Sequence, residues 1–194
     1  LLSVSRDITA KRLADEALKS SEHRLRMALD AGRLGHWDLD LATGAMTASA
    51  ICKTNFGRAS SDDFSYEDLR AAIAPEHRPR MQASVERTMA TGTEQDGEYR
   101  IAKPNGTSGW VLIRGRLVRG LDGKPGTLSG VSLDISSLKT AEHALRESET
   151  RFETFAQAMP NQVWSATPDG LLDWFNDQVF SYSGLTVAEL AGNG

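Results

Sequence analysis

The side chains best suited to chemistry in this 194-residue sequence are one cysteine and four histidines. Cys52 is a candidate nucleophile, and a neutral imidazole at His36 or His77 could serve as an axial haem ligand. However, His36 lies beside a tryptophan in a predicted strand and His77 lies near a predicted helix start, so we expect surface or capping roles for both. His143 lies among charged residues of a predicted linker, which is typical of a solvated side chain.

No motif for catalysis accompanies these residues. The sequence lacks a nucleophile elbow, a Walker loop, a Gly-x-Gly-x-x-Gly turn and a metal-spaced pair of His and Glu residues. A single cysteine excludes an intramolecular disulfide and the usual zinc sites. Arg114, Arg116 and Arg119 place a small basic face on one strand, which we interpret as a solvated strand edge. The sequence therefore predicts no catalytic centre in this chain.

The composition is that of an ordinary globular protein. Hydrophobic residues make up 40% and charged residues 25%, which is enough apolar material for a buried core. The net charge of −4 argues against nucleic-acid binding, which needs a basic face. No apolar run is long enough to cross a bilayer and no signal peptide opens the chain. We therefore expect a cytoplasmic location without membrane contact by this segment, and leave membrane attachment of the parent chain open.

An internal repeat divides the chain. Residues 4–28 align without gaps on residues 131–155, so that Asp7 falls on Asp134, an offset of 127. Ten of the aligned positions are identical. The same offset relates Trp37 to Trp164 and extends the similarity beyond the aligned segment. A period of this length is a whole domain with its connector.

Between the two copies, strand and helix signals follow a definite order. Met81, Val85 and Met89 recur every fourth position and place an apolar stripe on one face of a longer helix. The dipeptides Asn105-Gly106 and Asp122-Gly123 are typical of hairpin turns with positive φ. The predicted elements are a helix over 20–31 that stops at Gly32, strands over 34–41 and 45–48, short helices within 49–74, a helix over 77–90, and strands over 98–102, 110–118 and 128–135.

These residues carry a family likeness. The segments that share it are Gly35-His36-Trp37-Asp38-Leu39-Asp40, Thr43-Gly44, Glu98-Tyr99-Arg100-Ile101, Pro104-Asn105-Gly106, Trp110-Val111, Asp122-Gly123-Lys124-Pro125, Gly130 and Asp134-Ile135-Ser136. Together they resemble a PAS domain with its C-terminal PAC motif. The resemblance implies an α+β fold, a five-stranded antiparallel sheet with helices on one face, flanked here by long linker helices.

The repeat and the resemblance together predict five segments. They are the end of an upstream PAS domain (1–9), a linker helix (10–31), a complete PAS/PAC domain (32–137), a second linker helix that is a candidate coiled coil (138–159), and the opening of a truncated downstream PAS domain (160–194). The linker helix has a heptad-like seam, at Leu138, Ala141, Leu145, Ser148, Phe152 and Phe155. We expect a homodimer formed through the linker helices and the PAS domain, with one amphipathic helix packed on its own domain as the alternative.

The resemblance also places a ligand, where there is one, between the helices and the sheet. The candidate pocket residues are Met81, Val85, Met89, Tyr99, Ile101 and Ile113, and a filled hydrophobic core is the open alternative. Light-oxygen-voltage domains share this fold and form a flavin adduct through a cysteine. That cysteine lies in an Asn-Cys-Arg-Phe-like helix, whereas Cys52 lies in Ile51-Cys52-Lys53-Thr54, so we expect a small buried side chain here. The sequence therefore indicates no particular cofactor, and flavin and haem stay open as alternatives that no motif supports.

The junction between the last strand and the linker helix is the candidate site of signal relay. It comprises Asp134, Ile135 and Ser136, with Asp7 as the counterpart in the upstream copy, because a carboxylate there can accept hydrogen bonds from free amides at a helix start. The main hypothesis is a sensory relay module at the input of a histidine kinase, with a cyclic-dinucleotide synthase as the rival parent. A cofactor-bearing light or redox receptor and a structural dimerisation spacer are the two other hypotheses.

Overall fold

The computed structural model describes residues 9–120 and 125–190, and the chain divides into two compact units between Ser137 and Leu138. The elements of the first unit are α1 (Thr9–Ala31), β1 (Gly35–Asp40), β2 (Met46–Ala48), α2 (Ala50–Asn55), α3 (Tyr66–Ala72), the short 3-10 helix η1 (Pro75–His77), α4 (Arg78–Thr91), β3 (Gln95–Ala102), β4 (Ser108–Arg119) and β5 (Pro125–Asp134). Helix α5 (Ser136–Ala158) starts at the end of the first unit and continues into the second.

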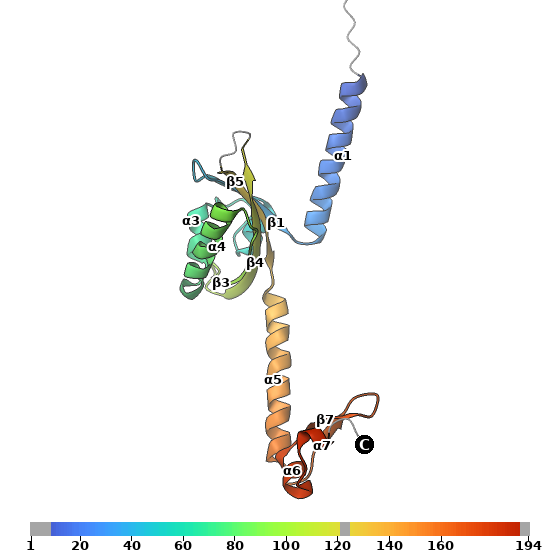
Figure 1. Ribbon diagram of the computed structural model, residues 1–194. Coiled ribbons are helices and arrows are strands. Elements are labelled where there is room, and N and C mark those ends of the chain that lie inside the picture. The colour runs from blue at the N-terminus through green and yellow to red at the C-terminus, as the bar shows by residue number, and fades with distance from the viewer. Residues whose placement is uncertain (1–8, 121–124, 191–194) are drawn as a thin grey trace, which may run out of the picture. The chain divides into compact units, whose positions relative to one another are not determined.

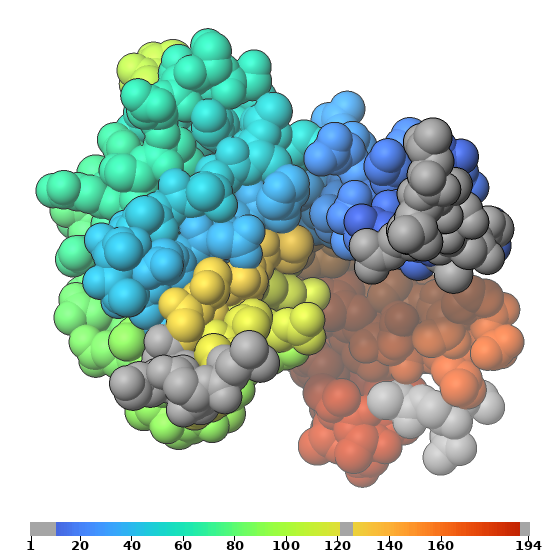
Figure 2. All heavy atoms as spheres, turned by 90° about the horizontal axis from the view of Figure 1, so that it is seen from above, coloured from blue at the N-terminus to red at the C-terminus, as the bar shows by residue number. Residues whose placement is uncertain are grey.

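The five strands of the first unit form one antiparallel sheet in the order β2-β1-β5-β4-β3. Helices α3 and α4 lie on one face of this sheet (Figure 1). Strand β5 is inserted between β1 and β4, so the blue atoms of β1 lie beside the yellow atoms of β5 in Figure 2, although the two strands are far apart in the sequence. This arrangement confirms the predicted α+β class and the predicted order of elements.

The core lies between the sheet and these helices. Inward-facing residues alternate along the strands as the period of two requires. The helices are fixed locally by their caps: the Ser49 hydroxyl accepts from the Cys52 amide, and Ser65 and Asp68 form a reciprocal capping box at the start of α3. The buried core comprises Trp37, Leu39, Cys52, Phe56, Phe64, Leu69, Ile73, Met81, Val85, Tyr99, Ile101, Val111, Ile113 and Leu128.

A row of four residues crosses the sheet in register. Trp37 on β1 pairs with Gly130 on β5, Gly130 pairs with Gly115 on β4, and Gly115 pairs with Gln95 on β3. A Cβ atom at Gly130 would lie 2.5 Å from Trp37 Cζ2, and one at Gly115 would lie 2.8 Å from Trp37 Cη2. The indole therefore lies across both glycines, and only glycine leaves it that space. We call these four residues the glycine row.

Two local predictions need correction. Strand β3 begins at Gln95 rather than at residue 98, because Gln95 already pairs with β4. In the Asn105-Gly106 turn only Gly106 has positive φ, since the Asn105 carboxamide bonds Thr107 and holds a turn of a different type. Helix α1 ends at Ala31, as predicted, and the left-handed residue after it is Arg33, at φ 51°, with the Leu34 amide bonded to the Leu29 carbonyl. The Asp122-Gly123 turn lies outside the described residues.

The second unit is small. After α5 it contains β6 (Trp164–Ala166), β7 (Leu172–Phe175), α6 (Asp177–Ser183) and α7 (Val187–Leu190), with β6 and β7 paired antiparallel. Fully buried Asn176 ties it together: its side chain accepts from the Val163 amide and donates to the carbonyls of Ala156 and Asn161. None of the helices in the described part of the chain is both long and apolar enough to span a membrane.

Candidate functional site

A small cavity of about 10 Å³ lies between the helices and the sheet. All five strands contribute to its wall, together with α3 and α4. Two of its lining side chains have a buried polar atom without a hydrogen-bond partner among the described residues: Nε1 of Trp37 and Oε1 of Gln95. The lining residues are Trp37, Met46, Tyr66, Leu69, Met81, Val85, Gln95, Ile113 and Leu128.

The six candidate pocket residues separate into three groups. Met81, Val85 and Ile113 line the cavity. Tyr99 and Ile101 are fully buried in the same core without lining it. Met89 is 39% exposed and does not line it, which corrects its assignment. The reason is geometric: two steps of four residues rotate a side chain by about 80° around an α-helix, so the stripe turns away from the sheet.

The residues around this cavity do not fit a haem or a flavin. A volume of about 10 Å³ accommodates one water molecule, far less than either prosthetic group requires. None of the four histidines lines the cavity, so it offers no axial imidazole. His77 is engaged instead at the sheet surface, where its Nδ1 accepts from the Arg100 amide and its ring contacts that of Trp110. Across the described residues, no cluster of His, Cys, Asp and Glu could hold a metal ion.

Cys52 is equally unsuited to forming a flavin adduct. It is fully buried in α2, with its backbone packed against Gly35, and it is not part of the cavity lining. Burial raises the pKa of its thiol to about 11, because the charged thiolate is desolvated there and Ser132 and Lys53 compensate only in part. The thiol is therefore protonated at neutral pH and is a poor nucleophile.

At the relay junction Asp134, Ile135 and Ser136 join β5 to α5, and Lys103 and Trp110 contact them. Asp134 Oδ2 lies 2.8 Å from Lys103 Nζ, and Asp134 Oδ1 accepts from the Ser136 amide at 2.9 Å. The Ser136 hydroxyl in turn accepts from the Trp110 amide, and the Ile135 amide donates to the Trp110 carbonyl. Strand β4 is thus bonded directly to the first residue of α5, and Ile135 is buried between them.

The environment of Asp134 favours its charged form. Partial burial acts to raise its pKa, but hydrogen bonds from Lys103 and Ser136, together with the Lys103 charge, outweigh burial and lower the pKa below 3.8. The carboxylate is therefore ionised at neutral pH and keeps both contacts. Asp7, its counterpart in the repeat, lies outside the described residues.

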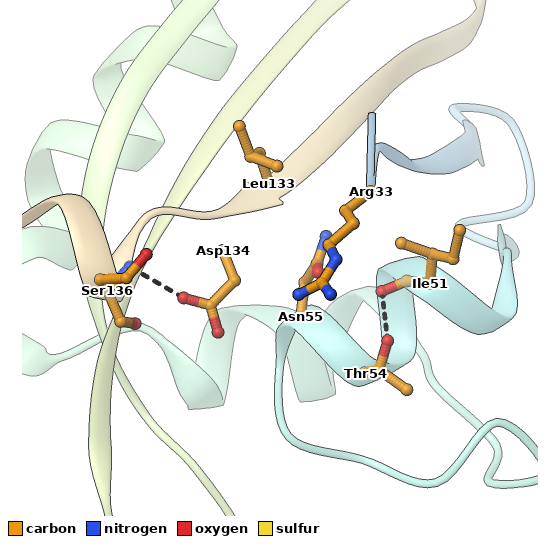
Figure 3. A pocket seen from close by; sticks show the side chains of 8 residues that line it. Arg33, Ile51, Thr54, Asn55, Leu133, Asp134 and Ser136 are labelled. Carbon is orange, nitrogen blue, oxygen red and sulfur yellow. Dashed lines mark hydrogen bonds between the residues drawn. The ribbon is translucent and has the colours of Figure 1, made fainter. Parts of the chain in front are cut away.

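An open pocket of about 590 Å³ lies beside this junction (Figure 3). It brings the end of α1 and the start of α5 together around α2, and Figure 3 shows the Arg33 guanidinium directed toward Asn55. Asn55 is itself buried and donates to the carbonyl and hydroxyl of Ser132 on β5. The lining residues are Arg33, Ile51, Thr54, Asn55, Leu133, Asp134, Ser136 and Ser137.

Sequence reasoning missed Arg33 and Asn55. A left-handed arginine after a glycine gives no composition signal, since Gly32 was the expected stop for α1. Asn55 resembles an ordinary helix-end residue in the sequence, and its pairing with Ser132 depends on the position of β5 in the sheet.

Comparisons with known proteins place this geometry in a family. Residues 46–132 match the family model described as PAS fold. Sensor protein FixL of Bradyrhizobium diazoefficiens is 29% identical over 84% of this chain, and a blue-light-activated histidine kinase of Brucella anthropi is 28% identical over 78%. The chain spans about a third of the length of each, 33% and 31%.

Two solved structures of signalling proteins also resemble this chain. A sensory box histidine kinase/response regulator from Burkholderia thailandensis is 27% identical with a TM-score of 0.58, and the match covers 68% of this chain and 98% of that one. The N-terminal domain of a diguanylate cyclase from Marinobacter aquaeolei, at 21% identity and a TM-score of 0.50 over 55% of this chain and 98% of that one, shares the fold. Residues 46–132, which lie in the first unit, therefore form a PAS domain.

Proposed function

We propose that this chain is a signal-relay segment in the input region of a histidine kinase, in which a change in the PAS core is passed through the relay junction into α5. The observation that carries the proposal is the bonding of that junction: β4 and β5 both hold the first turn of α5 through Lys103, Trp110 and Asp134. A change in the relative position of the two strands therefore acts on the start of the helix.

The functions of the similar proteins support a histidine kinase as the output domain of the parent protein. A sensor protein and a blue-light-activated histidine kinase are among the proteins that match most of this chain. The solved structure with 27% identity also comes from a histidine kinase. The diguanylate cyclase domain shares only the fold at its level of identity, so a cyclic-dinucleotide output has less support.

The repeat supports a tandem arrangement of PAS domains. The side chain of Ser49 accepts from the His36 amide, and the Ser49 amide donates to the His36 carbonyl. Asn176, which lies 127 residues after Ser49, exchanges the same two hydrogen bonds with Val163. Gly57 and Gly184, at the same offset, both have left-handed φ after a short helix. We take residues 160–194 as the opening of a downstream PAS domain, and residues 1–9 as the end of an upstream one.

Relay requires two arrangements of the domain whose balance the core can shift. Val85 lines the cavity, so a larger side chain there presses on the sheet from within. In the parent protein, Val85→Phe is expected to change the rate of histidine autophosphorylation about 5- to 30-fold, which corresponds to a bias of one or two kcal/mol. The measurement is incorporation of labelled phosphate from ATP.

Met89→Phe is the matched control, because Met89 lies one turn further along α4 and is partly exposed. It should leave the rate within twofold of the wild type. A folded Val85→Phe protein with the wild-type rate and the wild-type signal response would contradict core relay. A parent protein that makes a cyclic dinucleotide and no phosphohistidine would contradict the kinase assignment.

A further inference from the structure

The two ends of the glycine row carry complementary polar groups. Trp37 presents an indole N–H donor and Gln95 a carboxamide oxygen, and both side chains are at least 96% buried. Between them stand only Gly115 and Gly130, which have no side chains. Three strand spacings separate β1 from β3, roughly 14 Å, and the indole covers the greater part of that width.

Neither group has a hydrogen-bond partner within the part of the chain that the structure describes. Trp37 Nε1 and Gln95 Oε1 are both fully buried and unpaired there. Buried polar groups of this kind are rare, because each loses its bonds to water on folding and gains nothing in return. A donor and an acceptor left unpaired at opposite ends of one row therefore need an explanation.

The small cavity supplies one. Trp37 and Gln95 both line it, and its volume of about 10 Å³ corresponds to a single water-sized group. A hydroxyl oxygen is the chemical group that can accept from the indole N–H and at the same time donate to the carboxamide oxygen. A carbonyl could only accept, and an ammonium could only donate.

We infer that this cavity is a binding site for one hydroxyl group, held between Trp37 Nε1 and Gln95 Oε1. In a cavity of about 10 Å³ that group is a water molecule. Beside Gln95 the Tyr99 side chain fills the space over Gly97: its hydroxyl lies 2.3 Å from the position a Gly97 Cβ would occupy. That hydroxyl is also buried and unpaired within the described residues.

This inference deepens the proposed sensing function, because it names the chemistry that a core ligand would need. The binding site and the relay function can each be contradicted while the other holds. The binding site is read from the chain itself by spectroscopy, whereas the relay is read from the output of the parent protein.

The first test is nuclear magnetic resonance of the ¹⁵N-labelled 194-residue chain. Cross-peaks between the Trp37 indole proton and water, with the sign of a long-lived contact in paired NOESY and ROESY spectra, are expected. The indole of Trp164, which is 58% exposed, is the internal control and should show only exchange with bulk water.

The second test uses Gln95→Met, which keeps the length of the side chain and removes its polar group. If a hydroxyl bridges the two groups, this change leaves the buried hydroxyl without its acceptor, and Tm should fall by about 4 °C or more. Gln82→Met on the exposed side of α4 is the matched control and should shift Tm by less than about 2 °C.

The outcomes are distinct. A water cross-peak with the sign of a long-lived contact supports the site, and the absence of that cross-peak would overturn the inference. A higher Tm for Gln95→Met would also overturn it, because the fold gains stability when a buried carboxamide without a hydrogen-bond partner is replaced by an apolar side chain.

Discussion

At the scale of single residues, the junction between sheet and helix rests on one carboxylate with two partners. Asp134 has an ion pair on one oxygen and a helix-start amide on the other. Its side chain is 32% exposed and that of Lys103 is 19% exposed, so solvent weakens the pair without abolishing it. Both contacts depend on the carboxylate being charged, which links the junction to pH.

Replacing Asp134 by Asn should therefore destabilise the first unit in a pH-dependent way. Because the folded pKa is lower than 3.8, the charge contributes its full stability above that value and loses it as the pH falls through the folded pKa. We expect a loss of roughly 1 kcal/mol at pH 7. Urea unfolding at pH 7 and pH 3 measures the difference between variant and wild type.

The difference should shrink toward zero at the lower pH. Asp96→Asn is a suitable control, because the ion pair of Asp96 with Arg114 is more than half exposed on both sides. An Asp134 variant whose deficit is the same at pH 3 and pH 7 would show that the charge has no part in the stability of the junction.

At the scale of elements, β5 and α5 follow one another with Ile135 alone between them. The strand ends at Asp134 and the helix begins at Ser136. There is no flexible connection between them that could absorb a displacement of the sheet. A displacement of β5 therefore acts directly on the first turn of α5.

One residue inserted after Ser137 should alter output, because it rotates all of α5 beyond that point by about 100°. Seven inserted residues return the helix to within about 20° of its phase and should restore most of the activity. Autophosphorylation of the parent protein measures both. Equal activity in the two insertion variants would mean that the phase of the helix carries no signal.

The order of elements was predictable from the sequence because turns and apolar periods are local signals. The hairpin glycines and the stripe on α4 are visible without knowledge of the fold. The glycine row was not predictable, since it depends on the register of four strands, two of them contributed by the last third of the domain. Gln95 is polar and so was not expected in the core. Met89 was expected there from its spacing of four, but residues spaced by four stay on one face of a helix only over about two turns.

At the scale of the whole molecule, α1 and α5 each present an exposed apolar stripe. Leu18 on α1 is 59% exposed, and its counterpart in the repeat, Leu145 on α5, is 62% exposed. Leu25 and Phe152 are a second pair of equivalent positions, and each is more than half exposed. Exposed apolar stripes of this kind on long helices are typical of association surfaces. A second copy of the chain offers the same two stripes, which favours the predicted homodimer.

Light scattering of the purified chain should accordingly give the mass of a dimer at high micromolar concentration. Leu145→Glu should shift the equilibrium toward monomer by at least tenfold in Kd, because it buries a charge in the seam. Thr150→Glu adds the same charge on the outer side of α5 and should leave the mass unchanged. A wild-type monomer at that concentration would contradict the homodimer.

The buried thiol has a practical consequence. With a pKa of about 11, only about one Cys52 side chain in ten thousand is ionised at neutral pH, and alkylating reagents must also wait for local opening of α2. Because the sequence has no other cysteine, spin labels or fluorophores can be attached to cysteines introduced on α1 and α5 while the native thiol is kept. Distances between such labels would report the motion of the two helices in an otherwise unaltered protein.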